Sequence, residues 1–126
     1  MTDFDWVSAR AKCSLVPLFE KLYLEIEQDI SHINEILGDG YICKLIKNGD
    51  RAFSVVLHDH FDQGQAVRFR LVNGAIVASR GVDDSAFASA TPTLSDDKEC
   101  RLLVDGKERE LWQFRKLALE GLFFQW

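Results

Sequence analysis

The sequence has few cysteines, few prolines and no long apolar run, and these shortages exclude several classes of protein. Its three cysteines, Cys13, Cys43 and Cys100, are far apart and form no CxxC pair, so we expect neither a disulfide framework nor a zinc knuckle. We predict three small, buried, reduced side chains instead. No apolar stretch could cross a bilayer, and the acidic start MTDFDW is unlike a secretory signal. We therefore expect a cytoplasmic protein without a membrane partner.

Several catalytic and nucleotide-binding motifs are missing as well. The sequence has no glycine-rich phosphate fingerprint and no GxSxG segment, which disfavours nucleotide-binding enzymes and serine hydrolases of those types. The net charge of −5 argues against bulk nucleic-acid binding, which needs clustered lysine and arginine. The charge is uneven, because Glu20–Asp39 has six acidic residues and one basic residue, whereas Lys44–Arg80 has six basic and three acidic. We expect no cofactor, and catalysis is the less favoured hypothesis.

The strongest positive signal is a long amphipathic helix over residues 19–37. Its apolar residues recur in alternating steps of four and three, a spacing that places them on one stripe of a helix. These residues are Phe19, Tyr23, Ile26, Ile30, Ile33 and Leu37. Acidic residues occupy the other faces. The stripe must be covered, either by the chain's own sheet or by the same helix of a second copy.

The ends of the N-terminal helical segment can also be read from the sequence. Thr2 or Asp3 can cap a first helix, and Pro17 removes one backbone donor. Ser14 can cap a second helix that holds the proline in its first turn. We therefore predict a break or a kink near Pro17, with a break favoured. Gly38-Asp39-Gly40 ends the long helix.

The middle of the chain predicts an antiparallel meander of four to five strands. The expected strands are residues 41–47, 51–58, 65–72, 75–80 and a shorter one at 99–104. A three-residue loop at Lys47-Asn48-Gly49, with Gly49 left-handed in a G1 bulge, aligns the apolar residues of the first two strands on one face. The turn at Asn73-Gly74 could have two or three residues. Residues 81–97 are predicted to be a long surface loop.

A C-terminal helix completes the predicted fold. Asp105 followed by Glu108 suggests a capping box, with a largely apolar helix from Lys107 to about Phe124. The length and composition fit one domain, residues 1–126, with a core that needs no metal. We therefore predict an α+β fold in which the C-terminal helix packs on the sheet.

One polar cluster could carry chemistry. If the second strand continues, His58, His60 and Asp62 project from the same face. Two imidazoles and a carboxylate can hold Zn²⁺ or Fe²⁺ with open positions, which would make the protein a metal-dependent enzyme. An ordinary turn with solvated histidines is the favoured interpretation of the same residues.

The second face of the predicted sheet combines aliphatic and basic residues. With the register above, it carries Ile42, Lys44, Ile46, Ala52, Ser54, Val56 and His58, joined by Arg68, Arg70 and Val72. Arg68 and Arg70 among apolar neighbours could receive an acidic, hydrophobic segment of a partner, including the acidic side of the long helix from a second subunit. The alternative, which we favour, is that one helix covers this face and the aliphatic parts of the basic side chains pack along its rim.

The favoured functional hypothesis is a small protein-interaction or chaperone-like protein that acts as a homodimer. The expected contacts are the long-helix stripe, or the aromatic residues Trp112, Phe123 and Trp126 of the last helix. In size, acidity and mixture of elements the chain is similar to small bacterial secretion chaperones and to some toxin-immunity proteins, which implies a protein that binds another protein. The alternative is a small-ligand binder with an apolar pocket between the sheet and the C-terminal helix.

Overall fold

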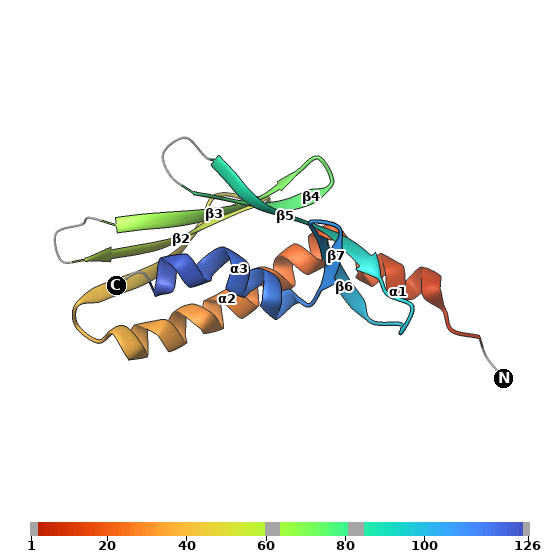
Figure 1. Ribbon diagram of the computed structural model, residues 1–126, viewed down its shortest axis with the longest axis horizontal. Helices are drawn as coiled ribbons and strands as arrows, with labels where there is room; N and C mark the ends of the chain where they lie inside the picture. The colour runs from red at the N-terminus through yellow and green to blue at the C-terminus, as the bar shows by residue number, and fades with distance from the viewer. Residues whose placement is uncertain (1–2, 60–63, 81–84, 125–126) are drawn as a thin grey trace.

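The structure is a computed structural model, and it describes residues 3–59, 64–80 and 85–124. Its helices are α1 (Trp6–Lys12), α2 (Leu15–Leu37) and α3 (Leu111–Phe123). Its strands are β1 (Tyr41–Lys47), β2 (Ala52–Asp59), β3 (Gly64–Val72), β4 (Ala75–Arg80), β5 (Ser85–Leu94), β6 (Cys100–Val104) and β7 (Lys107–Arg109). The strands form one antiparallel sheet in chain order, and the helices lie against it (Figure 1). The predicted α+β fold is confirmed.

The N-terminal helical segment is broken, as predicted. Cys13 and Ser14 separate α1 from α2, and Pro17 lies in the first turn of α2. The cap of α1 is Asp5, whose side chain accepts a hydrogen bond from the Ser8 backbone N–H. The prediction of Asp3 as the cap was therefore wrong, and Thr2 lies outside the described residues. Gly38 ends α2 with a positive φ of 66°, which an achiral residue adopts at little cost.

The β1–β2 hairpin has the predicted parity but a later loop. Lys47 pairs with Phe53, and the Asn48 N–H donates to the Ala52 carbonyl oxygen at 2.9 Å, so the loop consists of residues 49–51. The pairs run from Tyr41 to Lys47 without a register shift, so the predicted bulge is absent there. The observed register places Leu45 opposite Val55, whereas the predicted loop would have placed it opposite Arg51. The φ of 95° at Gly49 confirms its left-handed conformation.

The long loop predicted over residues 81–97 was wrong, because Ser85–Leu94 forms β5. Pro92 had suggested a loop. However, β5 pairs with β4 only up to Ala90, so Pro92 lies where β5 has a single neighbour, β6. A missing backbone donor is tolerated at such a position. Phe87 is the extra residue of a bulge, since Ser79 pairs with Ala86 and Ala78 with Ala88.

The start of the last helix was also predicted too early. Asp105 and Gly106, with φ of 53° and 77°, form a two-residue turn between β6 and β7. This conformation is the one that asparagine, aspartate and glycine favour in tight hairpins. The helix begins at Leu111, and its capping box pairs Glu110 with Gln113. The Asn73-Gly74 turn, left open by the sequence, has two residues as well.

One face of the sheet forms the core, and both long helices cover it. α2 lies against β1, and α3 lies against β3, β5 and β6. A chain of aromatic rings joins the two helices through the sheet: Phe19 of α2 to Phe53 at 5.1 Å, Phe53 to Phe69 at 5.0 Å, and Phe69 to Phe114 of α3 at 6.3 Å. The remaining apolar stripe of α2 is buried in this core apart from the partly exposed Tyr23 and Leu37. The stripe therefore packs on the chain's own sheet.

A disulfide joins Cys13, between α1 and α2, to Cys100, the first residue of β6. This overturns the prediction of three reduced cysteines. The sequence separation of 87 residues concealed the pair, because only the packing of α2 on the sheet brings the two positions together. Cys43 is the unpaired cysteine and is buried, as predicted. No helix within the described residues is long and apolar enough to span a membrane.

Candidate functional site

The predicted interaction residues lie on two different surfaces of the structure. Arg68 and Arg70 belong to β3 and point away from the helices, because the intervening Val67 and Phe69 are buried in the core. Trp112 and Phe123 belong to α3, on the helix side of the sheet. Trp126 lies outside the described residues. The sequence therefore points to two candidate surfaces, and each is described in turn.

The first surface is the outer face of the sheet, which we define by the outward positions of β1 to β4. The described residues of the outer face are Ile42, Lys44, Ile46, Ala52, Ser54, Val56, His58, Gly64, Ala66, Arg68, Arg70, Val72, Ala75, Val77 and Ser79. The predicted register across the first three strands is confirmed on this face: Ser54, for example, pairs with both Ile46 and Arg68.

Among the described residues, no helix covers the outer face. α2 and α3 both lie on the opposite side of the sheet (Figure 1). Ile42 and Ile46 are consequently 50% and 46% exposed. The favoured expectation that a helix covers this face was therefore wrong: the apolar stripe of α2 and the buried face of α3 are both used on the core side.

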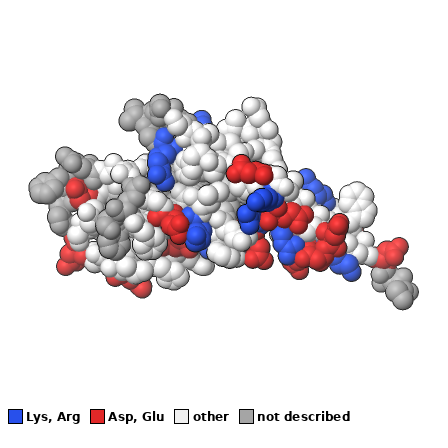
Figure 2. Space-filling view, in the orientation of Figure 1, with Lys and Arg blue, Asp and Glu red and all other residues white. Residues whose placement is uncertain are grey.

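The outer face differs in charge from the rest of the molecule. Its described residues include the cations Lys44, Arg68 and Arg70 and no aspartate or glutamate, although the whole chain has a net charge of −5. Many acidic side chains seen in Figure 2 lie on the lower, helix side and towards the N-terminal end. The outer face is therefore a local basic and aliphatic region on an acidic protein, which favours contact with negatively charged groups.

Arg70 adds a specific detail to this face. It pairs with Ala52 of β2 and with Val77 of β4, so its lateral neighbours are apolar. Its Nε is buried and has no hydrogen-bond partner among the described residues. An unsatisfied buried donor is unfavourable, and a guanidinium presents a fork of donors that matches a carboxylate. Arg70 is partly exposed, and a movement of its side chain that uncovers Nε would allow this donor to bind an anionic group.

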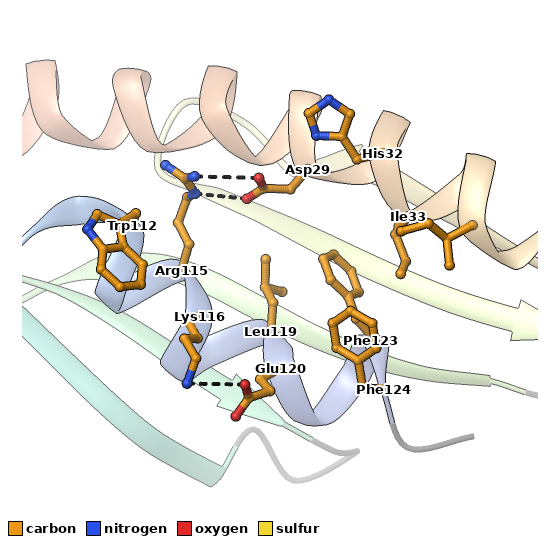
Figure 3. Close-up of a pocket in the computed structure, with 11 residues that line it drawn as sticks. Asp29, His32, Ile33, Trp112, Arg115, Lys116, Leu119, Glu120, Phe123 and Phe124 are labelled. Atoms are coloured by element: carbon orange, nitrogen blue, oxygen red, sulfur yellow. Dashed lines mark hydrogen bonds and ion pairs between the residues drawn. The ribbon is translucent and has the colours of Figure 1, made fainter.

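The second surface is a groove of about 370 Å³ between α2 and α3 (Figure 3). Its apolar walls include Ile33 and Leu119, together with the aromatic residues of α3. Arg115 closes one side, because its Nε lies 2.8 Å from an Asp29 carboxylate oxygen and its Nη1 lies 2.5 Å from Glu25. Two carboxylates on the acidic side of α2 thus meet a cation of the same chain. His32 lines the same groove and is exposed.

The space between the sheet and α3 is filled with side chains. Phe114, Ala118 and Leu122 face the sheet and are fully or almost fully buried. A second groove of about 480 Å³ opens at the margin, between the β6–β7 hairpin and α3. A small apolar ligand would therefore have to use a surface groove.

The edges of the sheet are both protected. On β1, the Asn34 side chain accepts a hydrogen bond from the Cys43 N–H at 2.8 Å and donates one to the Cys43 carbonyl oxygen at 3.0 Å. The side-chain amide thus occupies the backbone N–H and C=O of Cys43, one of the positions along β1 that an added strand would use. The other edge, β7, has three residues, all charged. Short charged edges and capped edges discourage strand addition.

The predicted metal ligands can be followed only in part. His58 is the last residue but one of β2 and lies on the outer face, and its Nδ1 lies 3.2 Å from the Asp59 carbonyl oxygen. His60 and Asp62 lie outside the described residues, so the predicted cluster stays a prediction. Within the described residues, no group of three histidine, cysteine, aspartate or glutamate side chains could hold a metal ion.

The unpaired thiol is chemically quiet. Burial raises the pKa of Cys43 from 9.0 to about 11, because the apolar surroundings disfavour the thiolate. A protonated, buried thiol is a weak nucleophile.

The fold and the two surfaces define the class of protein: a two-layer α+β protein with one sheet face covered by helices and the other open. Comparisons of the chain with protein-family models, with curated proteins and with solved structures find no match. The functional argument therefore rests on the geometry of the two surfaces.

Proposed function

We propose that this protein is a protein-binding module of the adaptor or chaperone-like type, and that its outer face binds an acidic, partly aliphatic segment of a partner protein. The observation that supports this most is the composition of the outer face. Three cations stand among aliphatic and small side chains, without an acidic residue among its described positions. An ordinary solvated face of an acidic protein would mix both signs of charge.

Each component of the outer face would contribute differently to binding. Ile42 and Ile46 lose exposed apolar area when a partner covers them, which supplies the hydrophobic part of the affinity. Lys44 and Arg70 would pair with partner carboxylates, which steers the encounter and fixes the orientation of the segment. The small residues Ala52 and Ser54 on β2 leave room for side chains of the partner.

The partner segment is proposed to lie across the face of the sheet. The alternative, addition as a further strand, is disfavoured because Asn34 caps the Cys43 backbone on one edge and the other edge is three charged residues long. The proposed activity is binding without catalysis, and it requires no cofactor.

The test uses random peptides displayed on phage and selected on the purified full-length chain. We expect the selected peptides to be enriched in aspartate and glutamate together with leucine, isoleucine or valine. Synthetic copies of them should bind the double variant Lys44→Glu, Arg70→Glu at least about tenfold more weakly, equivalent to about 1.4 kcal/mol. Binding to the wild-type protein should also weaken as salt is raised.

The matched control reverses the charge of two exposed lysines outside the outer face, Lys12→Glu on α1 and Lys21→Glu on α2. This control changes the net charge by the same amount, so it should bind the peptides nearly as well as the wild-type protein does. Equal losses in both double variants, or selected peptides that are basic or purely apolar, would contradict the proposal. Thermal unfolding of both variants checks that they fold.

A further inference from the structure

The outward side of α3 carries a row of four residues at a constant spacing of four. The row consists of Trp112, Lys116, Glu120 and Phe124. Trp112 and Phe124 are 52% and 58% exposed, which is unusual for aromatic side chains of this size. Between them, the Lys116 Nζ lies 3.1 Å from a Glu120 carboxylate oxygen (Figure 3). The row thus has an aromatic residue at each end and one charge of each sign in the middle.

This order of residues is self-complementary. When two such helices lie antiparallel about a two-fold axis midway between Lys116 and Glu120, Trp112 of each copy faces Phe124 of the other. In the same register, Lys116 of each copy faces Glu120 of the other. Two-fold dimers require a surface that matches itself in this way. Both the apolar contacts and the charge contacts are satisfied by a single register.

The shape of the surface fits the same arrangement. Trp112, Lys116 and Glu120 line both the α2–α3 groove and the β7–α3 groove, so the row is a ridge with a hollow on each side. Residues spaced by four form ridges, and when two helices cross at about 50° the ridge of each lies in the groove beside the ridge of the other. The paired residues of the two rows would then meet side by side. Leu117, which is 49% exposed, lies beside the ridge and lines the β7–α3 groove.

We propose that a second copy of this chain docks on this row, which makes the protein a two-fold dimer through α3. The proposal concerns a surface on the opposite side of the sheet from the outer face and does not rest on the proposed partner binding there. The contact of a single pair of helices buries less area than most stable interfaces do, which is more than about 1,000 Å². The dimer is therefore expected to form reversibly, and the fraction of chains in the dimer should rise with the protein concentration.

The test is sedimentation velocity of the full chain over a wide concentration range. The wild-type mass should rise from 14.4 kDa towards twice that value as the concentration increases. Lys116→Glu alone places two carboxylates opposite one another, and Glu120→Lys alone places two ammonium groups opposite one another. Each single variant should self-associate at least about tenfold more weakly than the wild-type protein.

Mixing the two single variants gives the decisive measurement. A Lys116→Glu chain and a Glu120→Lys chain are complementary at both charge contacts, so the mixture should form a heterodimer although each variant alone stays monomeric. The Lys116–Glu120 pair within each helix remains broken in this mixture, so a purely structural role of that pair cannot produce the recovery. Lys21→Glu, a reversal on α2, should dimerise like the wild-type protein.

Three results would overturn the proposal. The first is a wild-type chain that stays at 14.4 kDa up to its highest soluble concentration. The second is unchanged self-association in both single variants, and the third is a mixture of the two variants that fails to associate. Circular dichroism of each variant establishes that α3 is formed, so a loss of association can be attributed to the contact itself.

Discussion

The two faces of the sheet are built from the same strands, yet they differ in composition and in covering. On β3, Phe69 is fully buried beneath α3, whereas the next residue, Arg70, points to the uncovered side. The difference arises from the period of two in a strand, which sends successive side chains to opposite faces. It teaches that one set of strands can hold the core together with one face and present a chemically distinct surface with the other.

The helix layer shows a second contrast with the outer face. α2 has five of the six acidic residues in the three helices, and two of them, Glu25 and Asp29, contact Arg115 of α3. These contacts are partly exposed, so each contributes modestly to stability. The acidic side chains of α2 therefore lie on the helix side of the sheet, and the three cations Lys44, Arg68 and Arg70 lie on its outer face.

The largest expected loss of stability comes from a substitution on the core face of the sheet that leaves the outer face unchanged. Phe69→Ala removes a fully buried ring that contacts both Phe53 and Phe114, and it should lower the free energy of unfolding by about 3–5 kcal/mol. Arg70→Ala, one residue away, should change that free energy by less than about 1 kcal/mol. Urea denaturation followed by circular dichroism measures both. Similar losses in the two variants would contradict the assignment of the faces.

The next effect concerns the covalent link on the core side. The disulfide from Cys13 to Cys100 ties the start of α2 to β6, and it closes a long loop. Its reduction should lower the free energy of unfolding by about 2–5 kcal/mol, because the unfolded chain gains conformational freedom. Urea denaturation with and without dithiothreitol measures this change. Cys43→Ala should respond to the reductant like the wild-type chain, and a Cys13→Ser, Cys100→Ser variant should be insensitive to it.

The smallest expected effect near neutral pH is a difference in chemical reactivity between two neighbouring residues of β1. Cys43 faces the core and Lys44 faces outward. N-ethylmaleimide should leave Cys43 unmodified in the native protein at pH 8 but react with it in urea, whereas an acetylating reagent should modify Lys44 in both states. Mass spectrometry of proteolytic fragments reads out both sites. Rapid native labelling of Cys43 would show that β1 is not covered as described.

The same thiol also gives a pH dependence with a defined sign. Because burial raises the pKa of Cys43 to about 11 in the folded state, the folded chain holds this proton more tightly than the unfolded chain does. Its contribution to stability is therefore complete below about pH 9 and is lost as the pH rises through 11. The wild-type chain should lose more stability over this interval than Cys43→Ala does, when both are measured with the disulfide intact.

Much of the fold could be predicted from local patterns. The stripe of α2, the glycine at its end and the alternation in β3 each depend on neighbouring residues, and all three are confirmed. β5 and β7 were missed because their signals are weak: Ser85–Leu94 is rich in small residues and contains a proline, and Lys107–Arg109 is short and charged. These strands exist because the neighbouring strands offer backbone partners, a contribution that a local pattern does not contain.

The candidate surfaces were predictable to different degrees. Arg68 and Arg70 could be placed on a common face with Lys44 from the register alone, and Trp112, which was expected to be an interaction residue, is exposed. Asn34 and Arg115 were missed, since each bonds to an element other than its own, Asn34 to the next strand and Arg115 to the distant α2. The row on α3 is visible as a spacing of four in the sequence, but only the burial of Phe114 and Ala118 on the sheet showed that this row faces outward.

The sequence by itself determined the elements that depend on residues close together in the chain. These are a broken helical segment, a meander with one apolar face, and a last helix. The tertiary structure alone decided which face those helices cover, that Cys13 meets Cys100, and that a basic, aliphatic face stays open. The physical reason is that secondary structure follows from spacings of two to four residues, whereas covering a face is a competition between distant segments. That competition was settled by the apolar stripes of α2 and α3, which both pack on the core side.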